Sequence, residues 1–410
     1  MVERIYLDYA SQTPMLSEVR QAMAAALEEA GNPSSIHGEG RRAKQLLEQA
    51  RKQVAALINA KPEEIYFTSC GTESNNWALR GLLAANQRKG IPGPPENRAS
   101  RTSRTTQVGK HLVISAIEHP SISLVARRLE LDRRATVSLL PVDSEGIIAP
   151  SALKALIKPE TMLVSVMLAN GEVGTIQSIK ELAAIAHEHG ALIHTDAIAA
   201  VGHISVDVKE LGIDALSLAA NQMYGPPGAA ALYVRDGVRI LPLLEGGGQE
   251  HGGRSGTEAL PAIVGLGAAA ERSDRYQISN SISDIALRRN RLRDGLKERI
   301  ERIRFNGSWT SRLPHNLHVC IDGVSSESLV LGLDQAGIAA GLGSACNAKS
   351  MRPSHVLKAM GLSDDEAKGA LVLSVGLPTT EEEIDRALEI IPRVVQQLRS
   401  VTALTTRYQI

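Results

Sequence analysis

Short apolar runs alternate with helical patterns along the first two thirds of the chain. Runs typical of buried strands occupy residues 65–68, 112–116, 162–168, 191–195, 215–218 and 230–234. Residues 178–189 have helical spacing, with Ser178 and Glu181 arranged as a capping box and Gly190 as a stop. Buried strands separated by helices predict an α/β sheet with helices on both faces.

The pattern changes near residue 260, where a long helical stretch precedes a strand-like run at 317–321 and further helices. We therefore expect a large α/β domain over 15–260 and a smaller α+β domain built from 1–14 and 261–410. Residues 90–110 are rich in proline, hydroxyl residues and arginine and lack an apolar face, which predicts a mobile surface insertion. A solvated insertion is favoured over a basic patch for a partner.

The composition favours neither a polyanionic nor a lipid partner. The 410 residues carry 45 Lys and Arg against 45 Asp and Glu, and only 3% are aromatic, which predicts no binding to nucleic acid. No apolar run approaches about 18 residues and no signal-like segment opens the chain, so we expect a cytoplasmic protein without a membrane span. The three scattered cysteines predict no disulfide framework, and the histidines show no metal-ligand spacing.

Candidate chemical groups follow several of the predicted strands. Gly71 and Thr72 open a helix, where backbone N–H groups and a hydroxyl suit a phosphate. Asp196 ends a strand at the sheet edge where α/β proteins bind ligands, and equally it can cap the next helix. His119 also follows a strand, although such a histidine alone is more often incidental. A glycine-rich loop at 246–257 ends in hydroxyl groups that suit a phosphate.

The three cysteines differ in their surroundings. Cys346 lies among small residues in a segment that predicts an exposed, flexible loop, which suits a reactive thiol. Cys320 falls within the strand-like run at 317–321 and is expected to be buried. Cys70 fits either description.

Short motifs in a fixed order run through nearly the whole chain. They are YLDYA at 6–10, GNPSSIH at 31–37, CGTES at 70–74, EH at 118–119, NGEVG at 170–174, TDA at 195–197, RSGT at 254–257, GSAC at 343–346, PSHVL at 353–357 and TTEEEID at 379–385. With these motifs the sequence closely resembles the NifS/IscS-like cysteine desulfurases of iron–sulfur cluster assembly, within the class V aminotransferase family. The resemblance implies the PLP-dependent transferase fold type I, with a mixed, mostly parallel seven-stranded sheet in the large domain and a smaller α+β domain.

The resemblance also implies a homodimer that binds pyridoxal phosphate (PLP) near the subunit interface. In the family, a carboxylate at the position of Asp196 keeps the pyridine nitrogen protonated, so that the ring acts as an electron sink. Cys346 corresponds to the mobile thiol that takes sulfur from bound cysteine and becomes a persulfide. The cofactor-binding positions that carry over are Gly71, Thr72, His119, Asn170, Asp196 and, lent by the other subunit, Thr257.

Several positions depart from the family pattern, and they fall on its catalytic groups. Gln222 stands where the family has the lysine that forms a Schiff base with PLP, and an amide nitrogen is not nucleophilic. Val372 replaces the arginine that grips the substrate carboxylate, which removes a charge and five donors. The other replaced positions are Asn221, Ala199, Ala219 and Gly171.

Compared with the family pattern, the chain keeps the Cys346 loop but has Gln222 in place of the lysine. This combination leads to three hypotheses. The favoured one is a cysteine desulfurase-like protein of sulfur and iron–sulfur metabolism that is not a standard PLP desulfurase. Cys346 then carries a persulfide, or ligates an iron–sulfur cluster with ligands from a scaffold or sulfur-acceptor partner. One alternative is an active enzyme that holds PLP non-covalently. The other is a non-catalytic structural partner of an active paralogue.

Overall fold

The computed structural model describes residues 4–86, 110–278, 281–342 and 353–407. Most of the insertion predicted at 90–110, and the loop that carries Cys346, lie outside the described residues.

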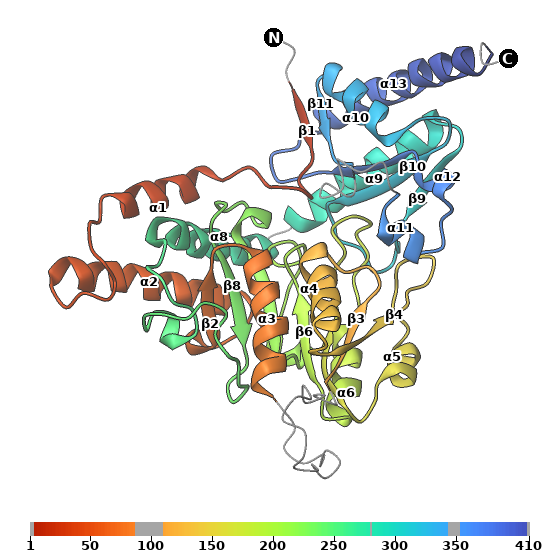
Figure 1. Ribbon diagram of the computed structural model, residues 1–410. Helices are drawn as coiled ribbons and strands as arrows, with labels where there is room; N and C mark the ends of the chain where they lie inside the picture. Colours follow the sequence, from red (N-terminus) through yellow and green to blue (C-terminus); the bar gives the residue numbers. More distant parts are fainter. Residues whose placement is uncertain (1–3, 87–109, 279–280, 343–352, 408–410) are drawn as a thin grey trace.

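A seven-stranded sheet forms the centre of the large domain (Figure 1), in the order β2-β8-β7-β6-β5-β3-β4. Strand β8 runs antiparallel to both its neighbours, and the other adjacent pairs are parallel. This mixed, mostly parallel sheet confirms the predicted fold. The strands are β2 (Ile65–Thr68), β3 (His111–Ser115), β4 (Thr136–Leu140), β5 (Thr161–Ser165), β6 (Leu192–Asp196), β7 (Ala215–Ala219) and β8 (Ala230–Val234).

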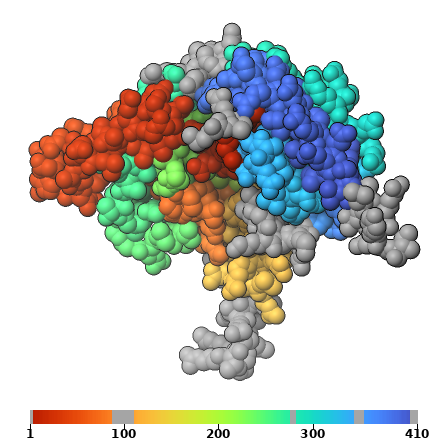
Figure 2. Space-filling model, turned by 90° about the horizontal axis from the view of Figure 1, so that it is seen from above, coloured from red at the N-terminus to blue at the C-terminus, as the bar shows by residue number. Residues whose placement is uncertain are grey.

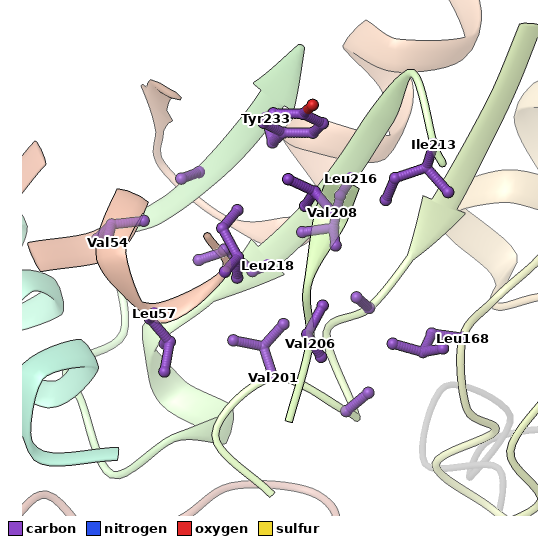
Figure 3. Close-up of a cluster of buried hydrophobic side chains, with 14 of the residues drawn as sticks. Val54, Leu57, Leu168, Val201, Val206, Val208, Ile213, Leu216, Leu218 and Tyr233 are labelled. Carbon is purple, nitrogen blue, oxygen red and sulfur yellow. The ribbon is translucent and has the colours of Figure 1, made fainter. Parts of the chain in front are cut away.

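Helices cover both faces of this sheet, because β3, β5, β7 and β8 are buried at every position and need apolar partners on each side. On one face, α3 (Gly71–Ala85) and α4 (Pro120–Leu131) pack over residues such as Leu112 and Leu232. On the other, the core of Figure 3 joins Val54 and Leu57 to Leu216 and Leu218. The remaining helices of this domain are α5 (Pro150–Leu156), α6 (Ile179–Glu188) and α7 (Val208–Leu211).

The first two helices extend from the body of the molecule as an arm. Helices α1 (Ser17–Leu27) and α2 (Gly38–Leu57) pack against α8 (Leu260–Ile278) at their inner ends. Figures 1 and 2 show the arm reaching well beyond the large sheet. Near its tip, Leu27 and Ile36 are 69% and 91% exposed. These side chains have no apolar cover within the described part of this chain.

The smaller domain is built around the antiparallel sheet β12-β10-β9, formed by β9 (Ile303–Asn306), β10 (Asn316–Ile321) and β12 (Ala370–Ser374). Strand β1 (Ile5–Leu7) pairs in parallel with β11 (Ile338–Ala340), so the start of the chain shares this domain's core. The helices here are α9 (Ser281–Arg299), α10 (Ser326–Gln335), α11 (His355–Ala359), α12 (Asp364–Ala367) and α13 (Glu381–Arg407).

The capping box predicted at Ser178 is wrong. The helix begins as expected and ends before Gly190, which has φ of +69°. The Ser178 side chain makes no cap hydrogen bond; instead its main-chain carbonyl accepts from the N–H groups of Glu181 and Leu182. Because Ser178 is exposed, water can hydrogen-bond its hydroxyl, so the capping geometry is not required.

A buried ion pair fixes the glycine-rich loop to the large sheet. The Glu250 carboxylate accepts from Arg51 at 2.8 Å through each oxygen and from the Phe67 N–H at 2.7 Å. Arg51 also donates to the Ile65 carbonyl at 2.6 Å. The two charged side chains are only 3% and 2% exposed. Each therefore depends on the other for compensation of its charge.

We expect Glu250→Gln to lower the free energy of unfolding by about 3 kcal/mol, because it leaves the Arg51 charge buried. The exposed Lys180–Glu210 pair supplies the control, and Glu210→Gln should cost less than about 1 kcal/mol. Urea unfolding followed by circular dichroism compares the two variants. Equal stability of both would show that the buried pair does not hold the loop.

Candidate functional site

A cavity of about 420 Å³ lies between the carboxyl edge of the large sheet and the smaller domain. Segments that follow β2, β3, β5, β6 and β7 form most of its wall. This is the edge at which α/β sheets bind ligands. The N-terminal segment and the smaller domain close the other side with Asp8, Ala10, Ser11, Gly341, His355, Val356 and Val372.

The turn from β2 into α3 forms one end of the cavity. Gly71 is the first residue of α3, and a Cβ at this position would collide with the side chain of Ile198. Thr72 follows and is exposed along the same wall. The first N–H groups of a helix lack intrahelical partners and favour an anion. This end therefore has the donors that a phosphate group needs.

A chain of hydrogen bonds links Asp196 at the end of β6 to His119. The Asp196 Oδ2 atom accepts from Asn75 Nδ2 at 2.7 Å, and Asn75 Nδ2 also donates to Ser121 Oγ at 2.8 Å. His119 Nδ1 lies 2.7 Å from Ser121 Oγ and accepts from the Ser121 N–H at 3.1 Å. In the neutral ring the proton is therefore assigned to Nε2.

Burial sets the protonation of this pair. It raises the pKa of the Asp196 carboxyl, against the lowering effect of its bonds from the Ile198 N–H and Asn75 and of nearby His119. Burial lowers the pKa of His119, so the imidazole is neutral at pH 7. A cationic ring nitrogen placed in the cavity would compensate the desolvated carboxylate. Asp196 and His119 thus fit a protonated pyridine ring.

Glu118 adds a second carboxyl behind the same wall. Its side chain is fully buried, and Oε1 accepts from the Met167 N–H at 2.8 Å. Burial, followed by the charge of Asp196, raises its pKa well above the usual value and so disfavours its ionised form. His355 Nε2 lies 2.9 Å from the Glu118 carbonyl, which ties the smaller domain to this wall.

The amide of Asn170 holds the turn that follows β5. Its Oδ1 accepts from the N–H groups of Glu172 and Val173, both at 2.9 Å, and its Nδ2 donates to the Ile117 carbonyl at 3.1 Å. Asn170 lines the cavity, but these hydrogen bonds use its side chain to shape the wall. Next to it a Cβ on Gly171 would lie 3.5 Å from Ala199 Cβ. Two small residues therefore face one another here.

Gln222 lines the cavity at the end of η2 (Ala220–Gln222), a short 3₁₀ helix after β7. Its Nε2 atom donates to the carbonyls of Ala10 at 3.2 Å and Ser11 at 2.9 Å. The Asn221 carbonyl accepts from the Thr13 N–H and hydroxyl, which anchors the segment from its other side. The amide hydrogens of Gln222 are thus engaged with main chain. Among the described residues that line the cavity there is no lysine and no arginine.

Thr257 lies outside this cavity. It is exposed at the end of the glycine-rich loop and does not line the wall. Arg254 Nε donates to Glu73 Oε1 at 2.8 Å, and Glu73 Oε2 accepts from the Ser69 N–H at 2.9 Å. The loop is therefore anchored beside the phosphate-type turn, and Thr257 is exposed outside the cavity of its own chain.

The cysteines occupy contrasting places. Cys320 lies in β10 and is 4% exposed, which confirms the predicted burial, and burial raises the pKa of its thiol to about 11. Cys70 is exposed and lines the cavity as the N-cap residue of α3. Cys346 lies outside the described residues. Its role as a reactive thiol stays a prediction.

Several residues that line the cavity or support its wall were not found from the sequence as functional candidates. Asn75 follows Gly71 by four residues on α3, so helical spacing places both on one face and could have indicated it. Ser121 follows His119 closely enough to suggest a local hydrogen bond. Asp8, Glu172 and His355 come from distant parts of the chain, and only the fold brings them together.

The aminotransferase class-V family model matches residues 5–91 and 98–387. The chain belongs to the aminotransferase class V family. The interruption of the match falls within the insertion predicted at 90–110.

Known members of the family resemble this class V chain over almost its whole length. It is 43% identical to cysteine desulfurase IscS of Methanosarcina thermophila, over 98% of this chain and 95% of that protein. It is also 43% identical to cysteine desulfurase IscS 1 of Archaeoglobus fulgidus, over 98% of this chain and 100% of that protein. A solved NifS-like protein superposes with a TM-score of 0.85 at 31% identity, over 96% of this chain and 100% of the other. The structure of SspA in complex with cysteine superposes with a TM-score of 0.76 at 32% identity, over 90% of this chain and 98% of that one.

No helix in the described part of this class V chain combines the length and the apolar character needed to cross a membrane.

Glu172 connects the cavity wall to the smaller domain. Its Oε2 accepts from Ser354 Oγ at 2.8 Å, just before α11, and its Oε1 lies 3.7 Å from His318 Nε2. Burial lowers the pKa of His318 to about 3, so the imidazole is neutral and offers no charge. Burial raises the pKa of Glu172 to about 7, against the lowering effect of the Ser354 bond.

We expect Glu172→Gln to change how stability depends on pH. The pKa of Glu172 is about 7 in the folded chain against an ordinary 4.5, so the folded state binds the proton more tightly. As pH rises from 4.5 to 7, the carboxyl ionises in the unfolded chain while the folded chain still holds its proton, so the wild type loses stability and the variant does not. The variant should therefore gain about 3 kcal/mol relative to wild type across this window. Urea titrations at several pH values measure this, and parallel curves would contradict it.

Proposed function

We propose that this chain is a cysteine desulfurase-like protein of sulfur and iron–sulfur metabolism that does not carry out standard lysine-dependent desulfuration. In this proposal Cys346 carries a persulfide or ligates a cluster together with a partner protein. The observation that carries it is the cavity wall, where Gln222 and Val372 both lie and where no described lining residue is a lysine or an arginine.

The chemistry of desulfuration explains why these two positions matter. A catalytic lysine forms a covalent bond to the cofactor and moves the substrate's α-proton. The Gln222 amide does neither, because it does not titrate near neutral pH and its Nε2 donates to two main-chain carbonyls. His119 is no substitute base through Nδ1, since that atom accepts from Ser121. Val372 supplies no charge to hold a substrate carboxylate.

The cavity nevertheless fits PLP held without a covalent bond. Gly71 and Thr72 at the start of α3 would receive its phosphate, and Asp196 would pair with its pyridine nitrogen, with His119 beside the ring. When bound, PLP supplies an electron sink for chemistry at an amino-substituted carbon. The Asn75 and Ser121 hydrogen bonds hold the carboxylate and the imidazole in place for this role.

A homodimer in the cytoplasm is part of the proposal. Thr257 is exposed and outside its own cavity, which leaves it available to the site of a second subunit. The exposed Leu27 and Ile36 on the arm give a second copy an apolar surface to cover. The free thiols of Cys70 and Cys320 suit a reducing compartment. An iron–sulfur scaffold or a sulfur-acceptor protein is the partner that this function requires.

We expect the purified chain, given PLP, L-cysteine and a thiol reductant, to release sulfide at least about 100-fold more slowly than a lysine-containing relative. The double variant Gln222→Lys with Val372→Arg should raise the rate by about 10-fold or more, because it restores the base and the carboxylate clamp. Gln222→Met with Val372→Arg is the matched control, since it restores the clamp but not the amine. A wild-type rate equal to that of the relative, abolished by Cys346→Ala, would refute the proposal.

The second candidate is an active enzyme that holds PLP non-covalently, and the intact hydrogen-bond chain from Asp196 to His119 favours it. A visible-absorption titration should then give a saturable spectral change on PLP binding. Asp196→Asn should weaken that binding by about 10-fold to 100-fold, because it removes a charge-assisted hydrogen bond. Asp236→Asn changes an exposed carboxylate and is the control. A spectrum identical to that of free PLP would eliminate this candidate.

A further inference from the structure

A distinct subsite lies where the N-terminal segment meets the smaller domain. Asp8, Gly341 and Val372 line the same cavity. The pairing of β1 with β11, and the bridges Asp8–Ser374 and Gly341–Val372, bring their main chains together. A Cβ on Gly341 would lie 2.7 Å from Asp8 Oδ1 and 3.5 Å from Val372 Cβ. The carboxylate and the valine therefore flank a residue that has to be small.

The side-chain donors of Ser11 and Gln222 at this end are already used, so these groups and Asp8 offer acceptors to a ligand. Ser11 Oγ donates to Asp8 Oδ1 at 2.8 Å. The Gln222 Nε2 atom donates to the Ala10 and Ser11 carbonyls. Asp8 forms no ion pair among the described residues. The remaining capacity of the Asp8 carboxyl group and Gln222 Oε1 are left for a ligand. The amide oxygen only accepts hydrogen bonds, and so does the carboxyl group when it is ionised.

Any charge that the carboxyl groups of the wall carry is negative, and burial disfavours the ionised form of each of them. Besides Asp8, the carboxyl groups of Glu118, Glu172 and Asp196 line the wall, and no described lining residue is a lysine or an arginine. A ligand carboxylate at this end would meet an ionised Asp8 with like charge, and no described lining lysine or arginine would hold it. An ammonium or guanidinium group would meet an unlike charge and hydrogen-bond acceptors.

We propose that the Asp8 subsite binds the cationic end of a small amine and disfavours ligands that place a carboxylate there. The inference rests on the proposed function, in which Val372 has ended the recognition of the substrate carboxylate, and it adds the class of ligand that replaces it. Asp8 is the determinant of specificity, Gly341 provides the space beside it, and Val372 leaves its charge unpaired.

L-Arginine and agmatine provide a direct test, because they differ only by one carboxylate. We expect calorimetric titration of the full chain, without added PLP, to show agmatine binding at least about 10-fold more tightly than L-arginine. Asp8→Asn should weaken agmatine binding by about 10-fold to 100-fold. The amide side chain of the Asp8→Asn variant keeps an oxygen that can accept from Ser11, so the fold should be preserved. Asp236→Asn, in an exposed pair, should leave the affinity unchanged.

Val372→Arg extends the test by pairing with Asp8 and supplying donors, so the preference should reverse towards L-arginine. If this variant fails to fold, Asp8→Asn still decides the question. Binding of neither ligand, equal affinities in wild type, or an unchanged affinity in Asp8→Asn would overturn the inference. Neither ligand contains a thiol, so the outcome is independent of whether the chain releases sulfide. A failure here is thus distinguishable from a failure of the proposed function.

Discussion

The site depends on one constraint: several carboxyl groups share a cavity, and the described residues that line it include no lysine or arginine. Asp196 and Glu118 lie behind the carboxyl edge of the sheet, Glu172 joins that edge to the smaller domain, and Asp8 arrives from the start of the chain. Desolvation opposes their ionisation, and hydrogen bonds from Asn75, Met167 and Ser354 only partly offset it. A ligand that brings positive charge would complete the site.

In the proposed function, the scaffold of this class V chain is kept while the groups that act on a substrate differ. The helix start at Gly71, the Asp196–Asn75–Ser121–His119 chain and the ion pairs that hold the glycine-rich loop all keep a cofactor-shaped cavity. Gln222 and Val372 line this cavity and offer neither an amine nor a cation. The hydrogen bonds from Gln222 Nε2 to the Ala10 and Ser11 carbonyls hold that side chain against the N-terminal segment.

The sequence predicted the buried strands of the large sheet well and its half-exposed edge strand poorly, and it missed the buried strand β12 of the smaller domain. Strands β2 and β8 match the apolar runs at 65–68 and 230–234 because burial on both faces leaves a continuous signal. The edge strand β4 (Thr136–Leu140) was missed, since most of its residues are at least partly exposed. For the site, motif order indicated Asp196 and His119. It could not reveal that Asn75 bonds a carboxylate 121 positions away, or that Asp8 flanks Gly341, because tertiary packing creates those contacts.

The central claim is that no lysine of this chain holds the cofactor. Intact-mass spectrometry after incubation with PLP and borohydride reduction tests it most directly, because reduction traps any covalent bond between the cofactor and a lysine. We expect an unchanged mass for the wild-type chain, and one added pyridoxyl phosphate for Gln222→Lys. A single stoichiometric adduct on a lysine of the wild-type chain would contradict the account, since it would reveal a catalytic amine outside the described lining.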